Sequence, residues 1–165
     1  MKIAFVLDDG LDKPDGVQQY IITLGQWLRQ EGHIVHYIVG ETHRKDIGNV
    51  HSMSKNLSLN FNGNRVSVPR GTTKKVIQEL LEKEKFDVLH VQMPYSPQLG
   101  ARVINCAPAF AAIIGTFHIV PYSRTGAMAT RVLRLMLWSS LKRFDSVVSV
   151  SQPAARFAKK SLGVK

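Results

Sequence analysis

The sequence lacks the features that would place it in a membrane or in an oxidising compartment. No apolar run approaches the ~20 residues that a membrane-spanning helix needs. The start of the chain, residues 1–7, has one basic residue but too short an apolar stretch for a signal peptide, and Asp8 and Asp9 follow at once. Cys106 is the only cysteine, which excludes an intrachain disulfide and fits a reducing compartment. We therefore expect a soluble, cytoplasmic protein.

Acidic residues are also scarce. The chain carries 12 Asp and Glu against 22 Lys and Arg, which leaves a net charge of +10 with histidine neutral. Such an excess favours polyanions, whether nucleic acid, anionic lipid or a phosphorylated substrate. The basic residues are spread over segments that also have apolar faces. Charge alone therefore leaves two interpretations open, a polyanion-binding surface and a merely basic solvated one.

Apolar runs alternate with helical patterns along the 165 residues, which is typical of βα units around a mostly parallel sheet. A chain of this length is the usual size of one domain, and no linker or repeat divides it. We predict an α/β fold in one domain, residues 1–165. The expected strands are 2–7, 33–39, 57–61, 65–68, 87–91, 112–117 and 146–150. The expected helices are 17–30, 74–84, 98–106, 126–143 and 153–162.

Two of the connecting segments carry specific expectations. Residues 41–55 are polar and are expected to form a loop. Asn62-Gly63-Asn64 separates two short extended runs, and Asn-Gly in that position predicts a β-hairpin.

Ligands of open α/β sheets bind outside the carboxyl ends of the strands, so the chemistry is expected there. Residues 8–18, 92–95 and 118–122 meet that condition. Gly16 opens a helix, where unpaired N–H groups and the helix dipole favour a phosphate. Because the full G-x-G-x-x-G pattern is absent, a simple turn at Gly16 remains the alternative.

His118 directly follows the predicted strand 112–117, so a buried strand delivers an ionisable ring to the edge of the sheet. A histidine there can donate or accept a proton near neutral pH, although a structural hydrogen bond is the commoner role. The other five histidines lack the spacing of a metal site and have no cysteine cluster nearby. We predict no bound metal.

Several motifs occur together in a familiar order. Gly16-Val17-Gln18 precedes an amphipathic helix that ends at residues 28–33. Three further motifs follow: Phe-Asp-Val-Leu-His at residues 86–90, Thr-Phe-His at 116–118 and Val-Ser at 150–151. This series resembles the retaining GT-B glycosyltransferases of family four over the whole chain. Because Phe61-Asn62-Gly63 matches an aromatic-Asn-Gly turn, the chain looks most like the phosphatidylinositol mannosyltransferases.

The resemblance implies a Rossmann-like three-layer domain that forms the N-terminal, acceptor-side half of such an enzyme. The C-terminal half, which binds the donor and is an expected partner, would be absent from residues 1–165. This chain alone should therefore not catalyse sugar transfer. The intact parent would be a hexosyltransferase that moves a hexose, with mannose a candidate, from a nucleoside-diphosphate sugar to an acceptor hydroxyl with retention. Phosphatidylinositol, another lipid or a polyol would be the acceptor. No cofactor is implied beyond the donor substrate.

The resemblance also assigns roles to residues. His118 would be the essential residue beside the reacting sugar, and Gly16 and Val17 would lie near the donor diphosphate. Lys74 and Lys75 would face an anionic membrane, which makes the inner face of the plasma membrane a candidate location. The residues that would contact the acceptor are Asp9, Gln18, Asn62, Gly63 and Arg65.

The sequence departs from the family at three places, and these leave the acceptor open. Asp15 stands where a second glycine is frequent, where it could instead cap the helix. Asp9 replaces an aromatic residue, and Gln92-Met93 replaces His-Glu before Pro94.

Other functions fit less well. A phosphorelay receiver needs an aspartate at the end of the middle strand, where this chain has His90, Val91 and Gln92. A dinucleotide oxidoreductase would need G-x-G-x-x-G in the first turn. A non-catalytic basic module for anionic membrane or nucleic acid remains the alternative, although no nucleic-acid reading motif is present and no nucleic acid is expected.

Overall fold

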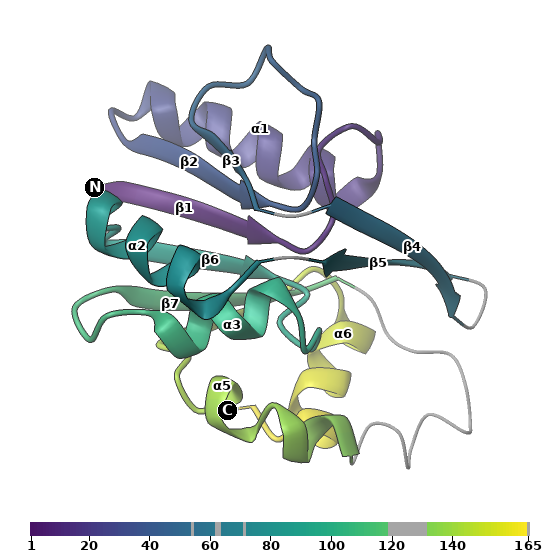
Figure 1. Ribbon diagram of the computed structural model, residues 1–165. Coiled ribbons are helices and arrows are strands. Elements are labelled where there is room, and N and C mark those ends of the chain that lie inside the picture. The colour runs from purple at the N-terminus through teal and green to yellow at the C-terminus, as the bar shows by residue number, and fades with distance from the viewer. Residues whose placement is uncertain (54, 62–63, 71, 119–131, 165) are drawn as a thin grey trace.

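The computed structural model describes residues 1–53, 55–61, 64–70, 72–118 and 132–164, and for residues 55–61 and 64–70 it describes the backbone alone (Figure 1). The strands are β1 Lys2–Leu7, β2 Ile34–Val39, β3 Val50–Ser52, β4 Lys55–Phe61, β5 Asn64–Arg70, β6 Val88–Gln92, β7 Ala112–Phe117 and β8 Ser146–Ser149. The helices are α1 Gly16–Gln30, α2 Lys74–Glu84, α3 Leu99–Cys106, α5 Trp138–Leu141, α6 Gln152–Phe157 and a π-helical turn, η1, Ala158–Leu162.

Six strands form one parallel sheet in the order β3-β2-β1-β6-β7-β8. The chain first builds outward from β1 through β2 to β3, and then continues on the other side of β1 with β6, β7 and β8. The strand order therefore reverses between β1 and β6. In open α/β sheets such a reversal opens a crevice at the carboxyl ends of the two strands.

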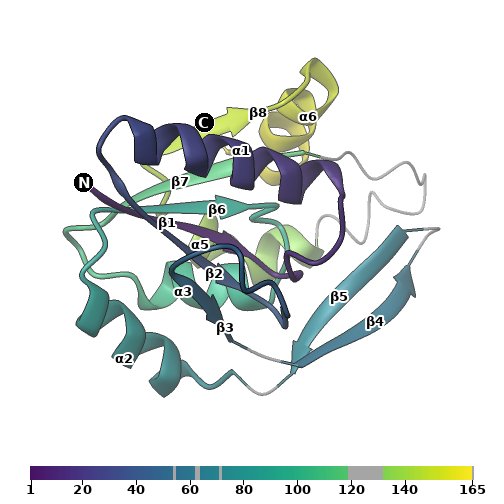
Figure 2. The same cartoon turned by 90° about the horizontal axis from the view of Figure 1, so that it is seen from above.

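Helices cover both faces of the sheet, which makes three layers. Figure 2 shows α1 on one side of the sheet and α2 and α3 on the other. Residues along β1 alternate between the two cores, since Ala4 and Val6 pack with α2 and α3 while Phe5 and Leu7 pack with α1. A strand buried on both faces reads as a continuous apolar run, which is how residues 2–7 were predictable.

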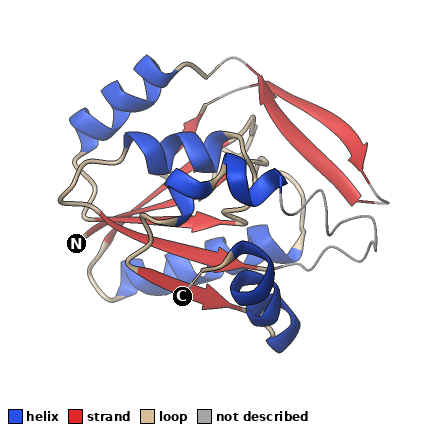
Figure 3. Cartoon of the chain, turned by 90° about the horizontal axis from the view of Figure 1, so that it is seen from below, coloured by secondary structure: helices blue, strands red, loops and turns tan. Residues whose placement is uncertain are grey.

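β4 and β5 form an antiparallel hairpin outside the main sheet, paired from Lys55 and Arg70 to Phe61 and Asn64. Figure 3 shows this hairpin standing apart from the six-stranded sheet. The predicted hairpin is confirmed, with strands longer than expected. Asn62 and Gly63, at its predicted turn, lie outside the described residues.

The predicted α/β fold with a mostly parallel sheet is confirmed, and two element predictions were wrong. Residues 41–55 are not all loop, because Val50–Ser52 forms the edge strand β3 beside β2 and Lys55 begins β4. A three-residue strand is too short to show a periodic pattern. The predicted helix 126–143 breaks at the buried Leu137 and ends at Leu141 within its described part, residues 132–143.

The C-terminal helix begins at Gln152, where the Ser151 hydroxyl caps it by accepting from the Ala154 N–H, and the helical winding stops at Gly163 as predicted. Gly163 has a φ of 69°, a conformation that glycine adopts without strain. No helix in the described part of the chain is long and apolar enough to cross a membrane.

Candidate active site

The carboxyl ends of β1, β6 and β7 bring the predicted segments to one edge of the sheet. Register places Val6 beside Val91 and Gln92 beside Thr116, so the residues that follow these strands emerge side by side. α1 starts shortly after β1. The edge at the strand-order reversal is therefore the candidate active site.

His118 is half-buried at this edge and is held by a neighbouring strand. Its Nε2 lies 2.8 Å from Oε1 of Gln92, whose Nε2 in turn donates to the carbonyl oxygen of His90 at 3.2 Å. The ring of Tyr20, from α1, packs edge-on against the His118 ring with centroids 5.2 Å apart. Burial lowers the pKa of His118 below its usual value, so the ring is neutral near pH 7.

His90 lies behind His118 in the core and is a structural residue. Its Nε2 lies 2.6 Å from the Thr116 hydroxyl, and the Phe5 and Tyr20 rings pack against it. Burial and, to a lesser degree, the neighbouring His118 lower the pKa of His90 to about 4. The uncharged ring therefore supports the floor of the site.

Asp8 follows β1 and points at the start of α3. Its Oδ1 accepts from the Gly100 N–H at 2.8 Å. The side chain is buried, and burial raises the pKa of Asp8 to about 6. Sequence reasoning missed this carboxylate, because nothing in the local pattern indicates that α3 covers it.

The raised pKa of Asp8 predicts a pH dependence of stability. The Asp8 carboxyl loses its proton near pH 3.8 in the unfolded chain but only near pH 6 in the folded chain. Between these two pH values the unfolded state binds fewer protons than the folded state. The free energy of unfolding of the wild-type chain therefore falls as pH rises through this range. Asp8→Asn should remove this decrease and keep the bond from Gly100. The free energy of unfolding of the variant, measured by urea titration, should increase relative to wild type by about 2 kcal/mol between pH 4 and pH 7. Parallel curves for the two proteins would contradict the assignment.

The start of α1 is open to solvent. Asp15 occupies the N-cap position, but its side chain accepts no hydrogen bond from the helix. A Cβ on Gly16 would meet nothing within 4 Å among the described residues, and Val17 is half-buried. Among the described residues there is therefore open space beside Gly16 at the start of α1. The proposed cap by Asp15 is absent.

Asp9 and Gln18 both contact the loop that follows β1. The Asp9 carboxylate accepts from the Gly10 N–H at 2.8 Å, and Gln18 Nε2 donates to the Gly10 carbonyl at 3.2 Å. Gln18 is buried, and its Oε1 has no partner among the described residues. A side chain at position 10 would collide with the Glu41 carbonyl oxygen, so only glycine fits there. Both predicted acceptor residues thus shape the loop beside the site.

The remaining predicted residues are placed less completely. Asn62 and Gly63 lie outside the described residues, and Arg65 belongs to β5, where it pairs with Asn60 and its side chain is not described. Lys74 and Lys75 form the exposed first turn of α2, and Lys75 Nζ lies 3.9 Å from Glu79.

The orientation of α2 follows from contacts at its two ends. The Thr72 hydroxyl, just before the helix, bonds to the Met53 carbonyl, which follows the carboxyl end of β3. Glu84, at the other end, pairs with Lys2 at the start of β1. α2 therefore begins at the same edge of the sheet as the candidate active site.

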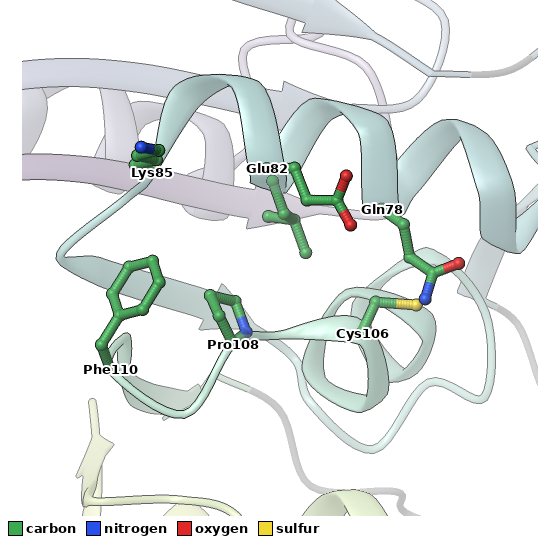
Figure 4. Close-up of a pocket in the computed structure, with 7 residues that line it drawn as sticks. Gln78, Glu82, Lys85, Cys106, Pro108 and Phe110 are labelled. Carbon is green, nitrogen blue, oxygen red and sulfur yellow. The ribbon is translucent and has the colours of Figure 1, made fainter.

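A surface cavity of about 430 Å³ lies elsewhere, between the C-terminal half of α2 and the segment after α3 (Figure 4). Leu81, Lys85, Cys106 and Phe110 contribute to its lining. Burial raises the pKa of the Cys106 thiol, so the thiol is protonated near pH 7. None of the predicted site residues lines this cavity.

The described residues contain no cluster of three or more His, Cys, Asp or Glu side chains that could hold a metal ion. His36 and His51 form a stacked pair whose ring nitrogens lie 2.9 Å apart, with no third such ligand beside them among the described residues.

Comparison with known proteins matches the chain to one family. The model of Glycosyltransferase Family 4 matches residues 14–165. Two similar relatives, from Mycolicibacterium smegmatis and Propionibacterium freudenreichii, are each a phosphatidyl-myo-inositol mannosyltransferase. The first is 28% identical over 165 residues and the second 28% over 175, in each case over 99% of this chain. The chain spans 42% and 44% of their lengths.

Among solved structures, the chain is similar to an alpha-glucosyltransferase in complex with UDP-glucose and DNA containing an abasic site. The TM-score is 0.57 at 15% identity, over 96% of this chain and 38% of that one. At this identity the likeness concerns the fold, which is the Rossmann-like half of a GT-B protein.

Proposed function

Since the chain belongs to glycosyltransferase family 4, we propose that it forms the acceptor-side half of a glycosyltransferase whose donor-binding half lies outside these 165 residues. The isolated half should not turn over, because the reacting sugar would be held between the two halves.

The observation that carries the proposal is the convergence of three segments on one edge of the sheet. The open start of α1 follows β1, and Gln92 ends β6, the strand that meets β1 where the strand order reverses. His118 follows β7, the next strand beside β6, and contacts Gln92. This is the position at which open α/β sheets bind ligands.

The start of α1 would receive the diphosphate of the donor. Its first N–H groups and the positive end of the helix dipole favour an anion, and Gly16 leaves room for a close approach. Asp15 is exposed and makes no bond to the helix, so its carboxylate is free to turn away from the phosphates.

The acceptor would be a lipid with a polyol headgroup, and the donor sugar a hexose. Phosphatidylinositol and mannose are our candidates, because the relatives are named for that acceptor and that sugar. Lys74 and Lys75 would hold the protein peripherally at the inner face of the plasma membrane, since α2 begins at the edge that carries the site.

In the proposed reaction the hexose passes from the nucleoside diphosphate to an acceptor hydroxyl with its anomeric configuration retained. His118, neutral near pH 7, would form a hydrogen bond to the reacting sugar. We propose that no metal ion takes part.

A transfer assay tests the proposal. The intact protein is incubated with radiolabelled GDP-mannose or UDP-glucose and with vesicles that contain or lack phosphatidylinositol. Label that enters the lipid phase only when phosphatidylinositol is present supports the proposal. No transfer from either donor to a lipid or to free inositol would favour the non-catalytic basic module instead.

A further inference from the structure

Gln92 connects two parts of the candidate active site. Its side chain is 2% exposed, and its amide lies between the His90 carbonyl oxygen and the His118 ring. The family resemblance assigns no role to glutamine here, since this position is one of the departures from the family pattern.

The orientation of this amide follows from hydrogen-bonding chemistry. A backbone carbonyl can only accept, so the NH₂ group of Gln92 must face His90, at 3.2 Å. The amide oxygen therefore faces Nε2 of His118, at 2.8 Å. An amide oxygen is also only an acceptor, so His118 must carry its proton on Nε2.

This arrangement determines what the other ring nitrogen can do. A neutral imidazole has one N–H and one acceptor nitrogen, so a proton on Nε2 leaves Nδ1 as the nitrogen that can accept a hydrogen bond. The Tyr20 ring packs edge-on against His118 and limits its rotation. Thr116 bonds to His90 instead and takes no part in this connection.

We propose that Gln92 is a positioning residue, which holds His118 as the Nε2–H tautomer so that Nδ1 accepts a hydrogen bond from a hydroxyl of the reacting sugar. The second clause rests on the proposed function. The tautomer itself does not, and it can be measured without donor or acceptor.

The test is long-range ¹H–¹⁵N NMR of the 165-residue chain labelled at histidine, which distinguishes a protonated from an unprotonated ring nitrogen. Loss of signals in His118→Asn assigns the ring. In the unsubstituted chain at pH 7 we expect Nε2 of His118 to be protonated and Nδ1 unprotonated. An Nδ1–H ring, or an even mixture of tautomers, would overturn the proposal without affecting the proposed glycosyl transfer.

Two substitutions that nearly conserve side-chain volume distinguish a specific effect of Gln92 on the His118 tautomer from a general disturbance of the core. Gln92→Leu removes the acceptor and should give His118 a mixture of tautomers, while the His90 signals keep their pattern. Thr116→Val removes the partner of His90 and should change the His90 signals alone. A His118 tautomer that survives Gln92→Leu would overturn the role of Gln92.

Gln92→Glu gives an independent readout if the leucine variant does not fold. A carboxylate beside the ring stabilises the imidazolium and should raise the pKa of His118 by about one unit or more. An unchanged titration of His118 would show that position 92 does not contact the ring, which contradicts the proposal.

Discussion

Replacing His118 with alanine is expected to lower the rate of sugar transfer by the intact protein by about 10²-fold to 10³-fold, the range for loss of one positioned hydrogen-bonding group beside the reacting atoms. The half-buried ring stands at the end of β7 and is held there by Gln92. Alanine removes the hydrogen bond to the reacting sugar and leaves the β7 backbone intact. The measurement is the rate at which label enters lipid in the assay with phosphatidylinositol vesicles.

His33→Ala is the matched control, because His33 lies in the turn before β2, at the opposite edge of the sheet. Its rate should equal that of the unsubstituted protein. The thermal unfolding temperatures of both variants show whether a lost rate reflects lost folding. A folded His118→Ala protein that keeps a tenth or more of its rate would remove His118 from the reaction.

The double substitution Lys74→Glu with Lys75→Glu is expected to weaken binding to anionic vesicles by about 30-fold or more. Each lysine near such a surface contributes about 1 kcal/mol, so loss of two contributions alone gives this factor and the added negative charges increase it. Both side chains are exposed in the first turn of α2, where a positive charge opposes the helix dipole. Glutamate there should not destabilise the helix. Sedimentation with vesicles of graded anionic content measures the binding.

Lys159→Glu with Lys160→Glu makes the same change of charge on the exposed part of η1, away from α2. If α2 contacts the membrane, this control should bind far more tightly than the first double variant. Equal weakening in the two would mean that net charge alone drives the binding. Absence of vesicle binding by the unsubstituted chain at low salt would exclude the membrane-bound acceptor.

The position of His118 could be predicted from the sequence because it depends on one strand. The apolar run at residues 112–117 identifies β7, and the next residue must then lie at the carboxyl edge. The hydrogen bond from His118 to Gln92 could not be predicted, because it joins residues 26 positions apart and depends on the register of β6 with β7. The burial of Asp8 likewise depends on where α3 packs.

The fold was predictable where helices and strands are long and periodic. It was less predictable where tertiary contacts determine whether a helix or strand forms and where it ends. α1 and α2 were expected almost to the residue, since each has a continuous apolar face and α2 has a capping threonine, Thr73. β3 has three residues and exists because β2 offers an open edge. The helical pattern around Leu137 is continuous in the sequence, so the break there could not be predicted.

We propose that this domain binds the acceptor at the carboxyl edge of its sheet. The most direct test is a titration of the ¹⁵N-labelled chain with glycerophosphoinositol, the water-soluble headgroup of phosphatidylinositol, followed by ¹H–¹⁵N NMR. We expect the shifted amides to cluster at the carboxyl ends of β1, β6 and β7 and in the first turn of α1, at Asp9, Gln18, Gln92 and His118. Shifts confined to the cavity between α2 and α3, or no shifts at millimolar headgroup, would contradict it.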